Sequence, residues 1–258
     1  MRAYAQLALA GFRRYSTYRQ AMFAGLAANV MFGLLRTSVL IAAVAAAPVA
    51  GYDVPAVVAY VWLGQGLMAF VQLWGDTRLT ERIRTGDVVV DLHRPWHLQT
   101  ALFAEDLGRA GFSAFLRFAP PLVIGSLIYP FRWPEAAVWP LFLLSSALAL
   151  VVSFGLRFLL NATTFWLLDS RGVITLYVVA VSVLCGLAVP LDFFPEWFQD
   201  LLWATPFPAL IQAPIDVYLD RRPQWTVLGY QAFWAVAVYA AGHVVLGRAV
   251  RKVAVQGG

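Results

Sequence analysis

The sequence predicts an all-α integral membrane protein with six transmembrane helices. Of its 258 residues, 61% are hydrophobic and only 13% carry a formal charge. Soluble domains use about 25% charged residues, which keep their surface in water. The 19 basic and 14 acidic residues of this chain are too few for such a surface. Apolar stretches of about 20 residues, the length that crosses a bilayer, also recur along the chain.

We expect one transmembrane domain over residues 1–258. Its first element is an amphipathic helix over 1–20, because Tyr4 and Leu7 recur at helical spacing on one side and Arg13 lies on the other. Such a helix can lie in the plane of the membrane interface. The expected spans are 21–47, 55–75, 101–128, 136–166, 172–191 and 226–247.

The positions of the basic residues predict the orientation. Thirteen of the 19 Lys and Arg residues fall on the side of the N-terminus, three fall on the other side and three lie inside spans. Basic loops stay in the cytoplasm. Both termini are therefore expected to be cytoplasmic, with the chain crossing a bacterial inner membrane several times and contacting its lipids.

Two rare residue types limit the chemistry of the chain. Its only lysine, Lys252, is followed by Val253, whereas a P-loop needs Lys before Ser or Thr. The lone Cys185 excludes an intrachain disulfide. His93 and His97 have the spacing of metal ligands on a helix, but Pro95 lies between them. We expect no catalytic, cofactor or metal site in this chain, and no binding of nucleic acid despite its basic charge.

The cytoplasmic connection 76–99 is rich in charge. Asp76 or Thr77 can cap a short helix that Gly86 ends, and Pro95 then interrupts the chain before the third span. A short charged helix on this side is typical of a docking element. A solvated loop explains the same composition.

The stretch 192–225 is too rich in proline to span the membrane and too apolar for a loop in water. Irregular backbone at membrane depth must be buried in protein or line a cavity. We expect an extracellular segment that enters the membrane and returns, with Trp197, Trp203 and Tyr218 at the interface. Its candidate residues are Pro190, Phe194, Pro195, Trp197, Pro206 and Pro214.

Ionisable and amide side chains also occur inside the predicted spans. A charge at the bilayer centre costs about 3 kcal/mol on insertion scales, so such groups normally face protein or water. We expect Glu105 to pair with Arg109 four residues later. Polar residues that recur at helical spacing lie on one side of a span. These sides line either a transport pathway or a contact between subunits, or their arginines reach headgroups, carbonyls and carboxylates. The candidates are Asn29, Arg36, Arg117, Ser153, Arg157 and Asn161.

Over its whole length the chain resembles the membrane subunits of ATP-binding-cassette exporters of the second permease type, within a bacterial branch that works with a separate ATPase. Prolines and aromatics before the last span carry most of this resemblance. Its features are Tyr18-Arg19, Gly86 to Pro95, Phe165-Trp166, Gly186, Pro190, Phe194-Pro195, Pro206-Phe207 and Pro214.

The resemblance implies that residues 77–95 form a coupling segment between the membrane helices and the ATPase. It also implies two ATPase copies, which bind ATP and Mg²⁺, and a second permease that is identical or homologous. The exported substrate would be amphiphilic or lipophilic. The coupling residues would be Arg78, Glu81, Arg82, Arg84, Gly86, Asp87, Asp91, Arg94 and Pro95.

Two other functions fit parts of the pattern. An ion-coupled secondary transporter often shows internal repeats and broken helices near the membrane midplane. The halves 1–130 and 131–258 show no convincing repeat. A membrane scaffold without transport activity would suit the amphipathic N-terminus and the docking segment equally well.

Overall fold

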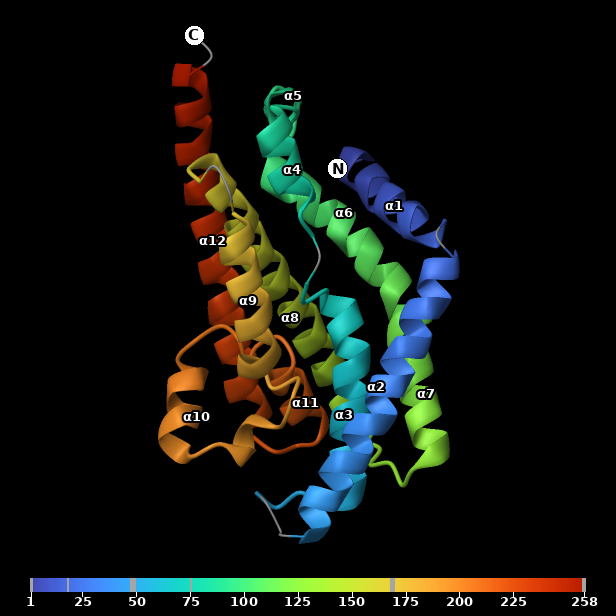
Figure 1. The fold of residues 1–258 in the computed structure, drawn as a ribbon. Helices are drawn as coiled ribbons and strands as arrows, with labels where there is room; N and C mark the ends of the chain where they lie inside the picture. The colour runs from blue at the N-terminus through green and yellow to red at the C-terminus, as the bar shows by residue number, and fades with distance from the viewer. Residues whose placement is uncertain (1, 18, 47–49, 75, 168–169, 257–258) are drawn as a thin grey trace.

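The computed structural model describes residues 2–17, 19–46, 50–74, 76–167 and 170–256, and none of these residues forms a β-strand. The helices form an elongated bundle (Figure 1). The chain ends, α1, α4 and α5 gather at one end, which we call the termini-bearing end. The helices α10 and α11 lie toward the opposite end. This all-helical fold confirms the predicted class.

The helices follow one another with short connections. The first group is α1 (Arg2–Ser16), α2 (Arg19–Ala46), α3 (Val54–Val71), α4 (Arg78–Thr85), α5 (Val88–Leu92) and α6 (Leu98–Ser113). The π-helical turn η1 (Ala114–Phe118) joins α6 to α7 (Ala119–Ile128). The second group is α8 (Val138–Ala162), η2 (Thr163–Phe165), α9 (Arg171–Leu184), η3 (Leu191–Phe193), α10 (Glu196–Trp203), α11 (Gln212–Tyr218) and α12 (Gln224–Gln256).

In the described part of the chain, five helical stretches are long and apolar enough to cross a bilayer. They are Phe23–Ala46, Val54–Val71, Leu98–Ile128, Val138–Phe165 and Gln224–Arg251. The expected span 172–191 contains the shorter helix α9, whose 14 residues extend about 21 Å. Gly186, at φ +84°, turns the chain where a longer helix would continue. The count of six spans therefore stays a prediction.

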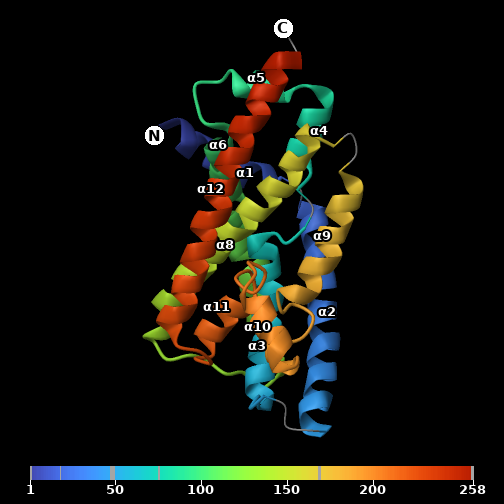
Figure 2. The same cartoon turned by 90° about the vertical axis from the view of Figure 1, so that its left-hand side faces the viewer.

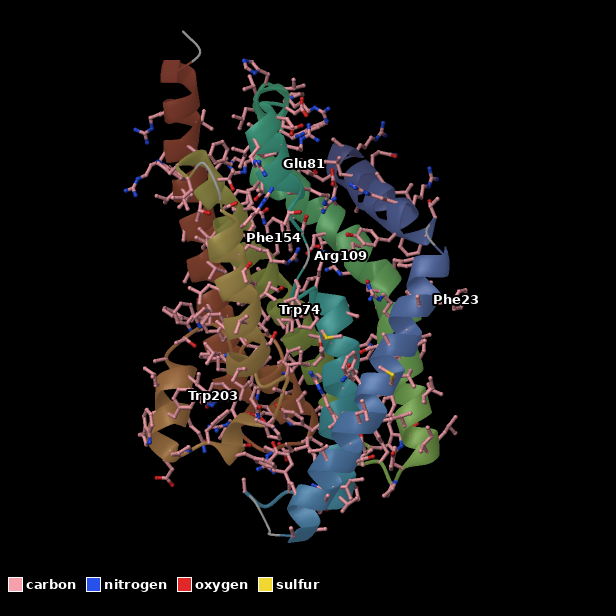
Figure 3. The ribbon with its side chains drawn as sticks, viewed as in Figure 1. Phe23, Trp74, Glu81, Arg109, Phe154 and Trp203 are labelled. Carbon is pink, nitrogen blue, oxygen red and sulfur yellow. The ribbon has the colours of Figure 1, made fainter. Side chains whose placement is uncertain are left out.

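The centre of the bundle is α3, which is buried along most of its length. Its side chains join a large apolar core with residues of α8 and α11, including the fully buried Trp62. Asp53 begins the helix by accepting a hydrogen bond from the backbone N–H of Ala56 (2.9 Å). Because α3 is surrounded by other helices, those neighbouring helices form the lipid-facing surface. On α2, for example, Phe23 points away from the bundle (Figure 3).

The third expected span is continuous but irregular. Pro120 and Pro121 follow η1 and cannot donate backbone hydrogen bonds to the preceding turn. Their rings also crowd that turn, and a π-helical turn is a common way to absorb such a disturbance. Figure 2 shows the second half of the bundle, where α8 lies between α12 and α9.

Two glycines allow α1 to lie directly on α6. A Cβ atom at Gly11 would overlap the backbone carbonyl of Glu105, and one at Gly108 would overlap the carbonyl oxygen of Ala8. Backbone atoms cannot move aside as flexible side chains can. The close approach of the two helices therefore depends on the absence of a side chain at both positions.

Gly108→Ala is expected to displace α1 from α6. The added methyl group overpacks a backbone contact, which typically costs about 1–3 kcal/mol. The measurement is the melting temperature in detergent, together with the rate of protease cleavage within α1. Gly229→Ala is the matched control, because nothing lies within 4 Å of that position. Equal melting temperatures and cleavage rates for both variants would contradict this account.

Candidate functional site

The segment α4–α5 rests on the ends of the long helices. Leu79 of α4 and Val88 of α5 share a small apolar cluster with Leu98, Phe154 and residues of α12. Gly86 ends α4 with φ +84°, a conformation that favours glycine, as the sequence predicted. The two short helices are therefore anchored on α6, α8 and α12 by apolar contacts.

A buried charge network lies beneath this segment. Arg157 of α8 is only 4% exposed and contacts two carboxylates, Asp76 through Nη1 (3.3 Å) and Asp106 through Nη2 (2.8 Å). Asp106 also accepts a hydrogen bond from Nε of Arg109 (2.6 Å). Two carboxylates shared between two guanidinium groups leave little net charge in the bundle. The network joins the connection after α3 to both α6 and α8.

Asp76 also binds the first residue of α4. Its Oδ1 accepts a hydrogen bond from Nε of Arg78 (3.0 Å), and Arg78 in turn contacts Glu105 of α6 (3.3 Å). Burial raises the pKa of Asp76, but the hydrogen bond and charge of Arg78 and the charge of Arg157 lower it more, so this pKa lies below its usual value. Asp76 is therefore ionised at neutral pH. The expected pair between Glu105 and Arg109 is wrong, because Glu105 pairs with Arg78 of α4 and Arg109 pairs with Asp106, three residues earlier on α6.

Asn161 holds the first turn of α4 against the end of α8. Its amide nitrogen donates to the carbonyl of Asp76 (2.8 Å), and its oxygen accepts from the Thr80 hydroxyl (2.7 Å). Thr80 also contacts the Thr164 hydroxyl, which donates to Ser170 (3.0 Å). These buried hydrogen bonds connect α4, α8 and the residue that precedes α9.

The same network closes the end of α3. Arg109 donates to the carbonyls of Ala69 (3.2 Å) and Phe70 (2.9 Å), and Ser153 donates to that of Val71 (2.7 Å). The last carbonyls of a helix have no partner within it and attract positive charge. Figure 3 shows Arg109 in the interior, between the helices. A displacement of this network therefore reaches the central helix directly.

The remaining expected coupling residues lie on α4, on α5 or in the turns next to them. Arg82 pairs with Asp91 (2.6 Å), which also lies 3.8 Å from Arg94. Asp87 accepts a hydrogen bond from the Thr85 hydroxyl (2.8 Å). The exposed Glu81 and Arg84 lie on α4, and Pro95 lies in the bend before α6. The two short helices are thus tied together by charge, with several charged groups left at the surface.

The other intramembrane candidates lie between α2 and its neighbours. Asn29 donates to the carbonyl of Gln65 on α3 (3.0 Å), and Arg36 donates to the carbonyl of Leu187 (3.0 Å). Arg117 lies half-buried on η1, and a Cβ at Gly25 of α2 would approach its guanidinium. Arg36 therefore meets a carbonyl just beyond the end of α9, one of the three partner types that the sequence left open.

At the opposite end, the segment before α12 is tied to the core through Gln212. Its side-chain oxygen accepts hydrogen bonds from the Tyr60 hydroxyl (2.5 Å) and the backbone N–H of Leu191 (3.0 Å). Its nitrogen donates to Asp216 (2.8 Å). A Cβ at Gly186 would collide with this group. Irregular backbone is thus satisfied by buried side chains.

A second charge cluster closes this end. Asp192 contacts Arg221 (3.3 Å) and Arg222 (3.1 Å) and accepts a hydrogen bond from the Tyr52 hydroxyl (3.1 Å). Arg222 also contacts Asp216 (3.2 Å), which is fully buried. Burial and the charge of Asp192 raise the pKa of Asp216 to about 7, although Arg222 opposes the shift.

The proline and aromatic candidates surround these two groups. Trp197 is exposed, as expected of an interfacial residue, and Trp203 packs against Tyr230. Tyr218 is instead buried against Trp139 and Phe142 and does not reach the surface of the bundle. Of the other candidates, Pro190, Phe194 and Pro195 flank η3, Pro206 lies in the turn after α10, and Pro214 lies within α11.

Sequence reasoning missed the acidic members of both clusters. Asp106 lies inside the third expected span and Asp216 lies in an apolar run, so their isolation among apolar residues was the available signal. Asp76 was considered only as a helix cap. Asp192 lies two residues after Pro190, in a segment whose interpretation used only its prolines and aromatic residues.

Asp216→Asn is expected to flatten the pH dependence of stability. A carboxyl whose folded pKa is raised stabilises the fold below its unfolded pKa, and this contribution is lost as the pH rises from about 4 toward 7. The melting temperature of the wild type should therefore fall over that range. The exposed Asp200 provides the control variant Asp200→Asn. A slope that is unchanged in Asp216→Asn would contradict the assignment.

The family of this chain follows from comparison with known proteins. Residues 28–257 match the family model described as ABC-2 family transporter protein. A search of curated proteins finds no significant match. Members of this family are membrane subunits of ABC transporters, associate with an ABC ATPase subunit and are not themselves the ATPase. A match over most of the chain, together with the apolar helices, shows that this multi-pass membrane protein belongs to the ABC-2 transporter family.

Proposed function

We propose that this chain is the permease subunit of an exporter for an amphiphilic or lipophilic substrate, and that it is driven by a separate cytoplasmic ATPase. The observation that carries the proposal is the network of Asp76, Asp106 and Arg157. It connects the α4–α5 segment to α6 and α8 through buried ion pairs. A docking segment joined to the bundle in this way can pass a displacement to the membrane helices.

The energy source lies outside this chain. Lys252 is its only lysine and has no P-loop context, so ATP and Mg²⁺ would be bound by the ATPase. Two ATPase copies and a second permease, identical or homologous, would complete the transporter. The excess of basic residues at the termini-bearing end supports cytoplasmic termini in a bacterial inner membrane.

In this mechanism, closure of the ATPases displaces α4 and α5 together. The pair between Arg82 and Asp91 keeps the two helices in one unit. Asp76 and Asn161 carry the displacement to α8, and Arg109 carries it to the end of α3. A packed interior responds by switching between arrangements and not by gradual deformation, which suits a change between inward- and outward-facing states.

A lateral groove supports an apolar substrate. It lies between α8 and α12, has a volume of about 660 Å³ and is open to the surroundings. Its walls are apolar, and the side chains of Tyr239 and His243 also line it. The internal network already engages Arg157, Asn161 and Ser153. We therefore propose that the substrate pathway lies elsewhere. Arg117 remains the candidate intramembrane cation.

Asp76→Asn tests the coupling step. We expect transport per ATP hydrolysed to fall about tenfold or more, since one charge-assisted contact to Arg157 and one to Arg78 are weakened. The measurement uses vesicles that contain this chain and its ATPase, with hydrolysis and substrate export followed in the same sample. Complex assembly is checked by co-purification.

Glu135→Gln is the control, because this exposed acid lies at the opposite end. Transport per ATP that is unchanged in Asp76→Asn would contradict the coupling route. Export that continues without the ATPase on an ion gradient would replace the proposal by secondary transport. A complex that forms but moves no substrate would indicate a scaffold.

A further inference from the structure

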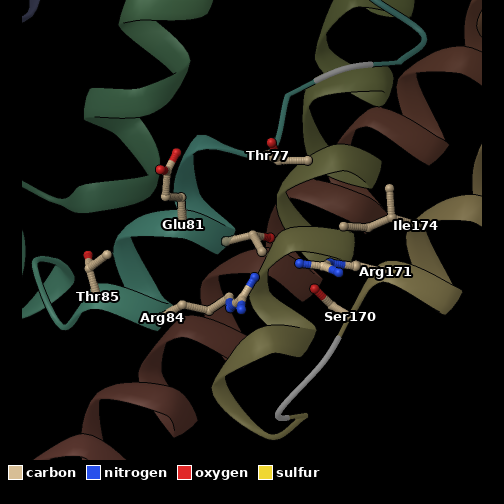
Figure 4. Close-up of a pocket in the computed structure, with 8 residues that line it drawn as sticks. Thr77, Glu81, Arg84, Thr85, Ser170, Arg171 and Ile174 are labelled. Atoms are coloured by element: carbon tan, nitrogen blue, oxygen red, sulfur yellow. The ribbon is translucent and has the colours of Figure 1, made fainter.

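The carboxyl of Asp216 differs from the buried acids of the termini-bearing end. It lies on α11 and is fully buried. At the termini-bearing end, Asp76 and Asp106 each contact two arginines. The same end holds a cavity of about 490 Å³ in which Arg84 faces Arg171 (Figure 4). Cations are therefore plentiful around the acids there, whereas Asp216 has to share one.

Among the described residues, Asp216 forms its ion pair with an arginine that a second acid also contacts. Its Oδ2 lies 3.2 Å from Nε of Arg222, and Nη2 of the same guanidinium lies 3.1 Å from Asp192. Asp192 has Arg221 as a further cation (3.3 Å), but Asp216 accepts a hydrogen bond from the neutral amide of Gln212 (2.8 Å). Of two acids that share cations, the more buried and less well paired one binds a proton more tightly.

The other groups near Asp216 add no charge to this cluster. On the side of α3, Tyr52 and Tyr60 contribute hydroxyl groups, which are uncharged near neutral pH. Asp220 lies in the exposed turn after α11. The helices α8 and α12 also pack against α11, and their charged residues all lie toward the termini-bearing end. These residues are Arg157, Arg248, Arg251 and Lys252.

A chain of hydrogen bonds connects Asp216 with the end of α9. Gln212, one turn earlier on α11, donates to Asp216 and accepts from the Tyr60 hydroxyl of α3 (2.5 Å). This hydroxyl also lies 2.5 Å from the carbonyl oxygen of Gly186. The backbone N–H of Gln212 donates to the carbonyl of the fully buried Cys185 (3.0 Å). Separation of α11 from α3 and from the end of α9 would break these contacts and bring water to both Asp216 and Cys185.

We propose that Asp216 is a proton-binding site that holds this end of the bundle closed. Its carboxyl is buried in the closed arrangement and would be surrounded by water in an open one. A group that binds a proton more tightly in one arrangement favours that arrangement as the pH falls. The role of the site rests on the proposed export function, in which this end faces the outside and opens to release substrate.

The direction of the effect follows from burial. Burial and the charge of Asp192 raise the pKa of Asp216 to about 7 in the closed arrangement. A hydrated aspartate has a pKa of about 4. The proton therefore stabilises closure fully below a pH of about 4, and this stabilisation is lost as the pH rises toward about 7. Each pH unit within this range changes the ratio of open to closed molecules by up to about tenfold.

Cys185, the single cysteine of the chain, provides the reporter for a test. The full chain in lipid nanodiscs is labelled with a water-soluble maleimide, and the rates of wild type and Asp216→Asn are compared at each pH. The neutral asparagine mimics the protonated carboxyl, and the ratio of the two rates removes the intrinsic pH dependence of the thiol. We expect equal rates at a pH of about 5, and a wild-type rate about tenfold or more higher at a pH of about 8.

Asp200→Asn is the matched control, because this acid is exposed on α10 at the same end and should follow the wild type at every pH. Cys185→Ser reports any reaction at other groups. If Asp216→Asn does not fold, Asp192→Asn carries the test. Removal of the neighbouring charge weakens proton binding at Asp216, so the midpoint of the pH response should move to lower pH.

A ratio of wild-type to Asp216→Asn rates that does not change with pH would overturn the proton site, and so would faster wild-type labelling in acid. An unmoved midpoint in Asp192→Asn would do the same. Labelling requires neither the ATPase nor a substrate. A pH response of the expected sign in a chain whose ATPase complex exports nothing would therefore support the proton site and remove the proposed function.

Discussion

The termini-bearing half of the molecule depends on the ion pairs that the buried guanidinium of Arg157 forms with Asp76 and Asp106. A charge that is 4% exposed inside an apolar bundle is tolerated only when carboxylates and hydrogen bonds replace its water. Asp106 and Asp76 provide this replacement from two different elements. Because moving either carboxylate away removes an ion pair from the buried Arg157, α6, α8 and the connection after α3 are held in one relative arrangement.

The same rule explains the opposite end. Asp192 and Asp216 are matched by Arg221 and Arg222, and Gln212 satisfies the irregular backbone before α12. The bundle therefore consists of an apolar centre around α3 with a polar network at each end. Apolar contacts are insensitive to direction, whereas ion pairs and hydrogen bonds have fixed geometry. The two networks consequently decide how the helices stand relative to one another.

Local signals predicted much of the fold. Hydropathy located the long helices, Gly86 was recognised as the end of α4, and the family followed from prolines and aromatics before the last span. Contacts between distant residues were not predictable in the same way. Glu105 and Arg109 have ideal helical spacing, yet Arg78 and Asp106 lie nearer in space. A neighbouring element supplied the partner of Glu105, and an acid at the alternative i,i+3 spacing on the same helix supplied that of Arg109.

By itself, the sequence determined that this is a helical, multi-pass membrane protein, because composition and periodicity follow directly from burial in a bilayer. The sequence also carries the match to the ABC-2 family and contains no P-loop. The tertiary structure decided which charges meet. It placed Asp76, Asp106 and Arg157 together across separations of 30 and 51 residues, ended α9 at Leu184 and brought Arg84 to face Arg171. Such contacts depend on how the helices pack, and packing is a property of the assembled bundle.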